Sequence, residues 1–205
     1  MTCPRIFCIG HNYAAHVREL GGRPRSTPAI FMKPPSALVP PGEPLRLPRK
    51  QGAVHHELEL VLRIGKEGKH IPRSDALAYI DALALGIDLT LRDMQKDLKQ
   101  AGRPWEACKA FDGSAPLGDF VSLDGIDLAD ITMTCHVNGT LRQSGHTGDM
   151  LFPVFEIIGL LSETWRLYEG DLVFTGTPPG VGPLEPGDEI TLASPEIGSV
   201  SWHCQ

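Results

Sequence analysis

Long apolar runs are missing from this sequence of 205 residues. The longest apolar stretches, such as residues 82–87, are far shorter than the roughly 20 residues that a membrane-spanning helix needs. Residues 1–13 also lack the basic segment followed by a long apolar one that marks a secretory signal. We therefore expect a cytoplasmic protein with no membrane partner.

Cysteine pairs and basic clusters are missing as well. The five cysteines are scattered without any C-x-x-C pair, which favours reduced thiols over a disulfide framework. The formal net charge is −6, and Lys and Arg do not cluster. Since affinity for nucleic acid depends on neutralising phosphates, we expect no nucleic-acid partner.

The chain does contain many short elements, which 22 glycines and 18 prolines separate. Apolar patterns predict strands at 5–10, 29–33, 44–48, 53–65 and 83–90, a hairpin around the Asn-Gly turn within 131–143, and three strands in 170–204. Helical spacing predicts short helices at 12–22, 73–84, 91–102 and 153–165. Strands dominate, so we expect a single α+β domain over residues 1–205 with a mixed, rolled β-sheet.

The stretch "AVHHELELVLRIG", residues 53–65, places two acidic side chains on one face of its expected strand. Because strand side chains alternate, Glu57 and Glu59 share this face. The simplest interpretation is a strand whose outer face is solvated. Two features argue against it: His55 extends the same polar face, and Asp88 ends an apolar strand, where a buried acid needs a partner.

Carboxylates without cysteine or histidine at ligand spacing are typical of sites for hard divalent cations. A cation also accounts for the two like charges, which would otherwise repel each other. Zinc is the weaker alternative: Cys8-x-x-His11 and His55-His56 resemble parts of zinc sites, but no second pair matches them. The sequence therefore favours Mg²⁺ or Mn²⁺, with Ca²⁺ as an alternative.

The first expected helix carries His16 and Glu19 three residues apart. At this spacing the carboxylate can orient the imidazole and raise its basicity, as a general base requires. An exposed salt bridge is the ordinary alternative for such a pair. Gly21, Gly22 and the prolines beside them would let the helix hinge, so we expect residues 11–30 to form a mobile lid.

Seven strings that follow one another along nearly the whole chain point to a known family. They are "GHNYAAHVREL", "FMKP", "HHELEL", "GIDLTLRDMQ", "PWEACKAFDG", "VNGTLRQ" and "FTGTPPGVG". With these strings in this order, the chain resembles the fumarylacetoacetate hydrolase family, above all its small acylpyruvate and fumarylpyruvate hydrolase branch. This resemblance implies that Glu57, Glu59 and Asp88 are metal ligands, and that His16 and Glu19 activate water.

The resemblance also implies roles for residues that their own context does not single out. Lys109 would help to hold water or the developing oxyanion, although a lone lysine is usually a surface charge. Arg92 and Gln95 would face the substrate; the alternative is an exposed polar helix face, which Lys99 is expected to occupy. Thr177 would help to hold a substrate carboxylate through its hydroxyl or backbone N–H group.

For function, the resemblance implies metal-dependent hydrolysis of a carbon-carbon bond in a 2,4-diketo acid, such as fumarylpyruvate, to pyruvate and a carboxylic acid. Oxaloacetate decarboxylation and isomerisation of a hydroxymuconate-type acid are alternatives on the same scaffold. A non-catalytic protein that binds metal or oxo acids is a further alternative, but it would not need His16, Glu19 and Lys109 together. The resemblance implies a homodimer as well.

Overall fold

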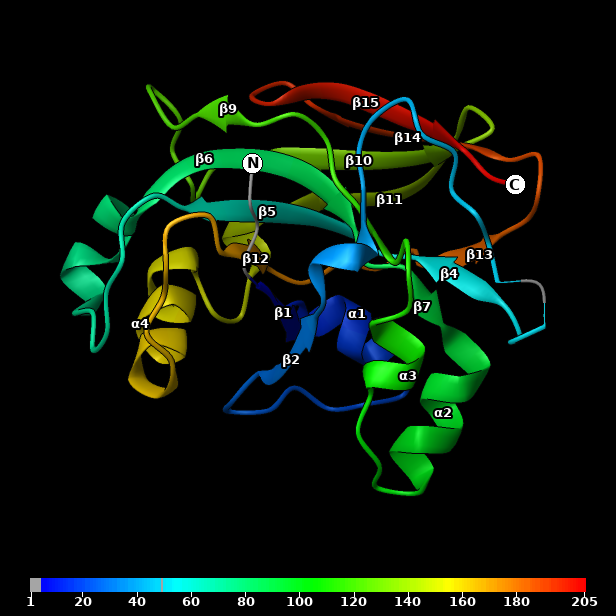
Figure 1. Ribbon diagram of the computed structural model, residues 1–205, viewed down its shortest axis with the longest axis horizontal. Helices are drawn as coiled ribbons and strands as arrows, with labels where there is room; N and C mark the ends of the chain where they lie inside the picture. Colours follow the sequence, from blue (N-terminus) through cyan, green and yellow to red (C-terminus); the bar gives the residue numbers. More distant parts are fainter. Residues whose placement is uncertain (1–4, 49) are drawn as a thin grey trace.

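The structure, a computed structural model, describes residues 5–48 and 50–205 and is built around a six-stranded sheet (Figure 1). The strand order is β2-β1-β12-β5-β6-β9; β1 and β12 are parallel, and the other neighbours are antiparallel. The strands are β1 (Ile6–Gly10), β2 (Ala29–Lys33), β5 (Leu58–Ile64), β6 (Ile80–Ile87), β9 (Val121–Ser122) and β12 (Leu172–Phe174). The expected α+β class with a mixed sheet is confirmed.

A four-stranded antiparallel sheet of order β11-β10-β14-β15 lies over one face of the main sheet (Figure 1). Its strands are β10 (Thr132–Val137), β11 (Thr140–His146), β14 (Glu189–Ser194) and β15 (Gly198–His203). Asn138 and Gly139, with φ of 51° and 74°, form the turn between β10 and β11. These left-handed conformations suit a tight hairpin turn, so the predicted hairpin is confirmed.

The two faces of β5 have different partners. Leu60 is fully buried in a cluster that includes Leu192 and Trp202 of the second sheet. Each such leucine contributes about 1.5–3 kcal/mol relative to an exposed one. Glu59 and Val61 alternate with the leucines and therefore face the opposite side. The second sheet does not cover the face that carries Glu59, so a site can form there between the main sheet and the helices.

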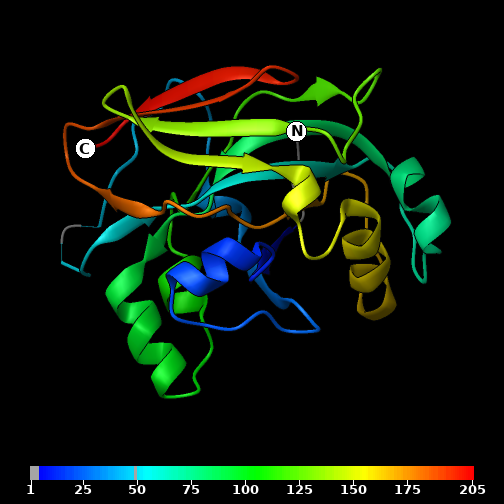
Figure 2. The same cartoon turned by 180° about the vertical axis from the view of Figure 1, so that it is seen from behind.

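Helices cover that opposite side of the main sheet (Figure 2). They are α1 (Ala14–Glu19), α2 (Arg92–Gln100), α3 (Glu106–Lys109) and α4 (Val154–Thr164). Smaller elements complete the described fold: β3 (Leu38–Val39), β4 (Val54–His56), β7 (Thr90–Leu91), β8 (Ala115–Pro116), β13 (Gly182–Leu184) and the 3-10 turns Pro35–Ala37, Arg73–Tyr79 and Thr147–Asp149. None of the helices in the described residues is long and apolar enough to cross a membrane.

The predicted helix at 73–84 is wrong. Residues 73–79 form a 3-10 turn, and β6 begins at Ile80. The local apolar spacing fits a helix, but residues 80–87 pair with β5 along its whole length. Tertiary pairing of a buried strand thus overrides a weak helical preference.

Three strand predictions also need correction. The run 53–65 is two strands, β4 and β5, separated at Glu57. Residues 44–48 form only an isolated bridge between Leu45 and Cys204. The segment 170–204 contains four strands in place of three, because Gly182–Leu184 adds to the edge of β4. Short edge strands of this kind carry little pattern of their own, so the partner strand decides whether they form.

The cysteines that the structure describes are all buried, free thiols. They are Cys8, Cys108, Cys135 and Cys204. The expected absence of a disulfide framework therefore holds among these four, while Cys3 lies outside the described residues.

Candidate active site

Three acidic side chains meet where β5 begins and β6 ends. Glu57 and Glu59 flank Leu58 at the start of β5, and Leu58 pairs with Ile87 at the end of β6. This register brings Asp88 beside the two glutamates, and its backbone N–H donates to the carbonyl oxygen of Glu57 at 2.8 Å. All three side chains are buried, and one carboxylate oxygen of each lies within 4.8 Å of the others.

Lysine and arginine side chains neutralise two of these carboxylates. Lys109 Nζ lies 2.7 Å from Glu57 Oε2 and 2.5 Å from Asp88 Oδ2. Lys33 Nζ is 2.8 Å from Asp88 Oδ1, and Arg92 lies 2.5 Å from Glu57 Oε1. Although burial alone would raise the pKa of Glu57, Lys109 and Arg92 hold it well below its usual range. Glu57 is therefore ionised at neutral pH.

Glu59 differs from the other two carboxylates because no Lys or Arg among the described residues forms an ion pair with it. Its Oε2 accepts a hydrogen bond from the backbone N–H of Gly176 at 2.7 Å. Burial, followed by the charges of Asp88 and Glu57, raises the pKa of Glu59 well above its ordinary value. A buried acid beside two carboxylates is costly unless a cation balances it.

These residues fit a divalent metal ion. Three hard carboxylates, one of which has no lysine or arginine paired with it, suit Mg²⁺ or Mn²⁺ better than zinc. Within residues 5–48 and 50–205, Glu57, Glu59 and Asp88 form the one group of three His, Cys, Asp or Glu side chains close enough to share an ion. Neither Cys8 with His11 nor His55 with His56 contributes to such a group, which removes the basis for the zinc alternative.

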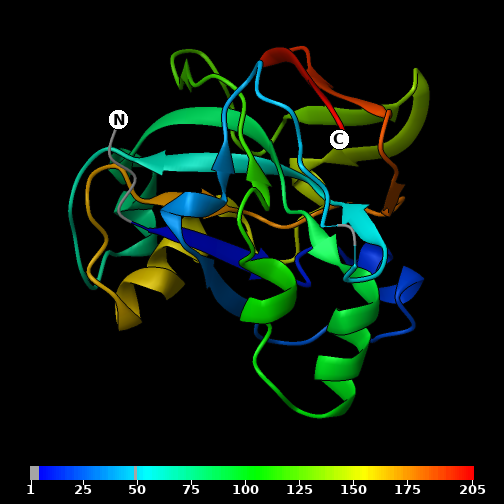
Figure 3. The same ribbon diagram turned by 45° about the vertical axis from the view of Figure 1, so that its right-hand side comes forward.

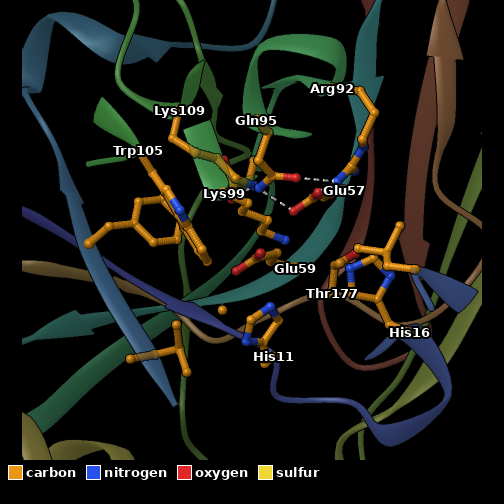
Figure 4. A pocket seen from close by; sticks show the side chains of 15 residues that line it. His11, His16, Glu57, Glu59, Arg92, Gln95, Lys99, Trp105, Lys109 and Thr177 are labelled. Carbon is orange, nitrogen blue, oxygen red and sulfur yellow. Dashed lines mark hydrogen bonds and ion pairs between the residues drawn. The ribbon is translucent and has the colours of Figure 1, made fainter. Parts of the chain in front are cut away.

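His16 lies in the pocket that the carboxylates line (Figure 4). Its Nδ1 is 3.0 Å from Glu19 Oε2, as expected for a carboxylate that orients an imidazole. The other oxygen of Glu19 accepts a hydrogen bond from the backbone N–H of Gly180 at 2.9 Å. His16 is buried, so the pair is no ordinary exposed salt bridge. Nδ1 is the nitrogen that contacts Glu19, which leaves Nε2 for a reacting group.

Gln143 of β11 fixes the direction of the hydrogen bonds around Thr177. The backbone N–H of Leu58 donates to Gln143 Oε1 at 2.9 Å, and His56 Nδ1 lies 2.9 Å from the same oxygen. Since burial lowers the pKa of His56, the ring is neutral and donates from Nδ1. Gln143 Nε2 must then donate to Thr177 Oγ1, at 2.8 Å. The Thr177 hydroxyl then donates to the carbonyl oxygen of Pro178 at 3.5 Å, a long contact that an acceptor in the pocket could replace.

Arg92 and Gln95 both line the pocket from α2 (Figure 4). Arg92 donates to Gln95 Oε1 at 2.6 Å as well as to Glu57. The amide N–H groups of Gln95 are its remaining donors. The pair therefore lies on a pocket wall and not on an exposed helix face.

Lys109 is buried, and its ammonium group is more constrained than the sequence suggested. Besides Glu57 and Asp88, it donates to Thr90 Oγ1 at 2.6 Å. All three N–H groups thus have acceptors. In this structure Lys109 therefore affects the pocket by its positive charge and by fixing the positions of the Glu57 and Asp88 carboxylates.

The fumarylacetoacetate hydrolase C-terminal family model matches residues 5–203. The chain belongs to the fumarylacetoacetate hydrolase family. A member with a similar sequence is oxaloacetate tautomerase YcgM of Escherichia coli (strain K12), which is 41% identical over 190 residues, or 92% of this chain and 87% of that protein.

Two solved structures of this family are also similar. Fumarylpyruvate hydrolase from Pseudomonas aeruginosa, in complex with Mn²⁺ and pyruvate, is 39% identical with a TM-score of 0.94 and covers 98% of this chain and 89% of its own. 5-Carboxymethyl-2-hydroxymuconate delta-isomerase from Mycobacterium smegmatis is 34% identical with a TM-score of 0.89 and covers 98% and 78%. The family is therefore enzymatic, and its members include hydrolases, tautomerases and isomerases.

Sequence reasoning missed several residues of this family member that line the pocket, as Trp105 and Lys99 do, or that contact a lining residue, as Lys33 and Gln143 do. Lys33, Trp105 and Gln143 had no assigned role, and Lys99 was expected on an exposed face but lines the pocket. A lysine at the end of the apolar run "AIFMK" was the one available signal for Lys33. The other three are placed by tertiary packing, which local pattern does not report.

Proposed function

We propose that this protein is a metal-dependent hydrolase that cleaves a carbon-carbon bond of a 2,4-diketo acid, an acylpyruvate such as fumarylpyruvate. The products are pyruvate and a carboxylic acid. The observation that carries the proposal is the buried His16, paired with Glu19, in the same pocket as three carboxylates. A base oriented in this way is what activation of water requires.

Glu57, Glu59 and Asp88 would hold Mg²⁺ or Mn²⁺, with Ca²⁺ as an alternative. A divalent cation bound there would polarise the oxygens of the oxo acid as a Lewis acid. The Mn²⁺ and pyruvate in the Pseudomonas aeruginosa relative support this choice of cofactor and of product.

His16 takes a proton from water, and Glu19 keeps the imidazole in the orientation and tautomer that allow this. The water oxygen then attacks the distal ketone carbon of the substrate. The bond between this carbon and the neighbouring methylene breaks, and the pyruvate fragment leaves as an enolate that takes up a proton.

The other pocket residues bind charge that the substrate carries or develops. The amide N–H groups of Gln95 stabilise the oxyanion, and the positive charge of Lys109 adds to this. Arg92 fixes Gln95 and Glu57 in place. The Thr177 hydroxyl donates to the substrate carboxylate in place of its long contact with the Pro178 carbonyl, while Gln143 donates to one of its lone pairs.

A direct test uses the purified protein with Mg²⁺ or Mn²⁺ and three acids: fumarylpyruvate, acetylpyruvate and oxaloacetate. Loss of enol absorbance and identification of the products define the reaction. We expect His16→Ala to lower the hydrolysis rate about 10²- to 10⁴-fold. His70→Ala is the matched control, because His70 also pairs with a glutamate but is exposed. Full turnover by the His16→Ala protein would contradict the proposal.

Oxaloacetate chemistry without hydrolysis is a second candidate, and the similarity to oxaloacetate tautomerase YcgM favours it. The isomerase from Mycobacterium smegmatis extends this candidate to double-bond shifts. Products separate the alternatives: interconverted oxaloacetate tautomers, carbon dioxide, or a shifted double bond, in place of pyruvate and a second acid. Tight binding of acylpyruvates without turnover would indicate a non-catalytic binding protein.

The homodimer, the cytoplasmic location, and the single catalytic domain with a mobile lid at residues 11–30 stay predictions. His11, His16 and Leu20 of that segment line the pocket, which is where a lid would have to lie. Gel filtration with light scattering would give the oligomeric state, and hydrogen exchange with and without pyruvate would report closure of the segment.

A further inference from the structure

A second cavity of about 360 Å³ opens beside the active-site pocket, and we call it the outer chamber. It lies between the segment that joins α1 to β2 and the carboxyl-terminal end of α2, which run close together in Figure 3. Four side chains line both cavities: His11, Leu20, Lys99 and Trp105. The two cavities therefore share a wall.

The outer chamber carries a concentrated positive charge. Its lining includes four cationic side chains, Arg23, Arg25, Lys99 and Arg103, and no aspartate or glutamate. None of these cations forms an ion pair with any residue that the structure describes. His11 adds no charge of its own, because burial, with help from Lys99 and Arg25, lowers its pKa to about 4 and leaves it neutral. In a protein of net charge −6, such a field favours an anionic ligand.

The active-site pocket itself is small. Its cavity measures about 20 Å³, roughly the space of one or two water molecules, so a long acyl group does not fit inside it. The acyl group must therefore extend past the shared lining residues toward the outer chamber. There the Trp105 ring, with Lys99 Nζ 4.9 Å from its centre, offers a flat apolar surface that ends in a cation.

We propose that the outer chamber binds a second carboxylate at the far end of the acyl group, and that Arg23, Arg25 and Lys99 select dicarboxylic substrates. This inference rests on the proposed hydrolase function. Guanidinium groups bind carboxylates through two parallel hydrogen bonds, which an uncharged acyl group cannot make. Burial, together with Lys109 and Arg92, lowers the pKa of Lys99, and an anion beside it would offset both effects.

The kinetic test compares two substrates, fumarylpyruvate, whose acyl group ends in a carboxylate, and acetylpyruvate, whose acyl group is uncharged. The variant is Arg23→Gln/Arg25→Gln, and the control is Arg46→Gln/Lys69→Gln, which removes two exposed charges elsewhere. We expect the variant to lower the ratio of kcat/KM for fumarylpyruvate over acetylpyruvate about 10- to 100-fold, since charged hydrogen bonds are lost. Arg23→Lys/Arg25→Lys should restore part of the ratio, and the control should keep all of it.

A binding test needs no turnover. Fumarate and crotonate have the same carbon chain, but crotonate carries a methyl group where fumarate has its second carboxylate. With Mn²⁺ present, quenching of Trp105 fluorescence should show at least tenfold tighter binding of fumarate than of crotonate. Trp105→Phe identifies the signal. The preference should disappear in Arg23→Gln/Arg25→Gln.

The two tests separate failure of this inference from failure of the proposed function. Hydrolysis of both acylpyruvates, with equal kcat/KM and no preference for fumarate, would contradict the role of the outer chamber in binding a carboxylate but would agree with the proposed function. A preference for fumarate that depends on the arginines, without hydrolysis of either acid, would support the chamber and overturn the function. An unchanged substrate ratio in the arginine variant would also overturn the chamber.

Discussion

At the scale of single residues, the charge balance of the pocket is set by which carboxylate has a cation beside it. Glu57 forms ion pairs with Lys109 and Arg92, and Asp88 forms ion pairs with Lys33 and Lys109. Glu59 accepts a hydrogen bond from a backbone N–H group and has no ion pair among the described residues. We therefore expect Glu59 to be the carboxylate of the three that responds most to metal and to protons.

Metal binding should strengthen as pH rises because Glu59 must lose its proton. Burial and the two neighbouring carboxylates raise its pKa in the metal-free protein, so its proton stabilises the fold below the unfolded value of about 4.3. That contribution is lost as pH rises through the higher folded pKa. We expect Mn²⁺ to raise Tm more at pH 8 than at pH 6. Thermal unfolding of the parent and Glu59→Gln tests this, and equal increases at both pH values would contradict it.

Gln143→Glu should impair substrate binding through Thr177. Glutamate can accept from Leu58 N–H but cannot donate to Thr177, whose hydroxyl would turn its proton toward the new carboxylate and away from the pocket. We expect KM to rise about tenfold, the cost of one hydrogen bond to a charged group. In a Thr177→Val background, Gln143→Glu should add little to KM. Additive effects in steady-state kinetics would argue against this coupling.

At the scale of secondary structure, the site depends on how short elements meet. The β5–β6 register places Asp88 beside the glutamates, and the loop from β12 to β13 supplies Gly176, Thr177 and Gly180. This loop connects the carboxylate cluster to α1, because the N–H of Gly176 donates to Glu59 and the N–H of Gly180 donates to Glu19. Its backbone geometry is therefore part of the site.

Gly180→Ala should destabilise the protein more than Gly187→Ala. Both glycines have positive φ, 99° and 96°, which costs alanine about 1–2 kcal/mol. A Cβ at Gly180 would also overlap the carbonyl oxygen of Arg142, whereas Gly187 has open space. The overlap should add about 1–3 kcal/mol to the loss in free energy of unfolding. Urea denaturation of the metal-free proteins measures the difference; equal losses would mean that the loop relaxes freely.

At the scale of the whole molecule, we expect metal binding and folding to be linked, because β5 and the end of β6 bring the three carboxylates together only in the folded chain. At a metal concentration 100 times Kd, we expect about 2.7 kcal/mol of stabilisation, or an increase in Tm of about 5–10 °C. Calorimetry with Mn²⁺ and then with excess chelator tests this. A Tm that changes with neither addition would contradict the proposed metal site.

Much of the molecule could be predicted from local pattern. The Asn-Gly hairpin, the helix at 91–102 and the α+β class follow from turn chemistry and apolar periodicity, which need no knowledge of distant residues. The glutamate pair at 57 and 59 was recognisable because strand side chains alternate. Local pattern also singled out Asp88, His16 and Glu19, and the resemblance to a family added Lys109, Arg92, Gln95 and Thr177. The structure places all of them in or beside one pocket.

The sequence by itself determined which residues carry charge, where the Asn-Gly hairpin turns, and that acidic side chains can share a strand face. Only the tertiary structure decided that residues 80–84 form a strand, that Lys33 and Lys109 serve Asp88, that Gln143 directs Thr177, and that Lys99 lines a cationic chamber. The physical reason is range. Alternation and turn preferences act over a few residues, whereas ion pairs and buried hydrogen bonds join segments whose distance is set by sheet register and packing.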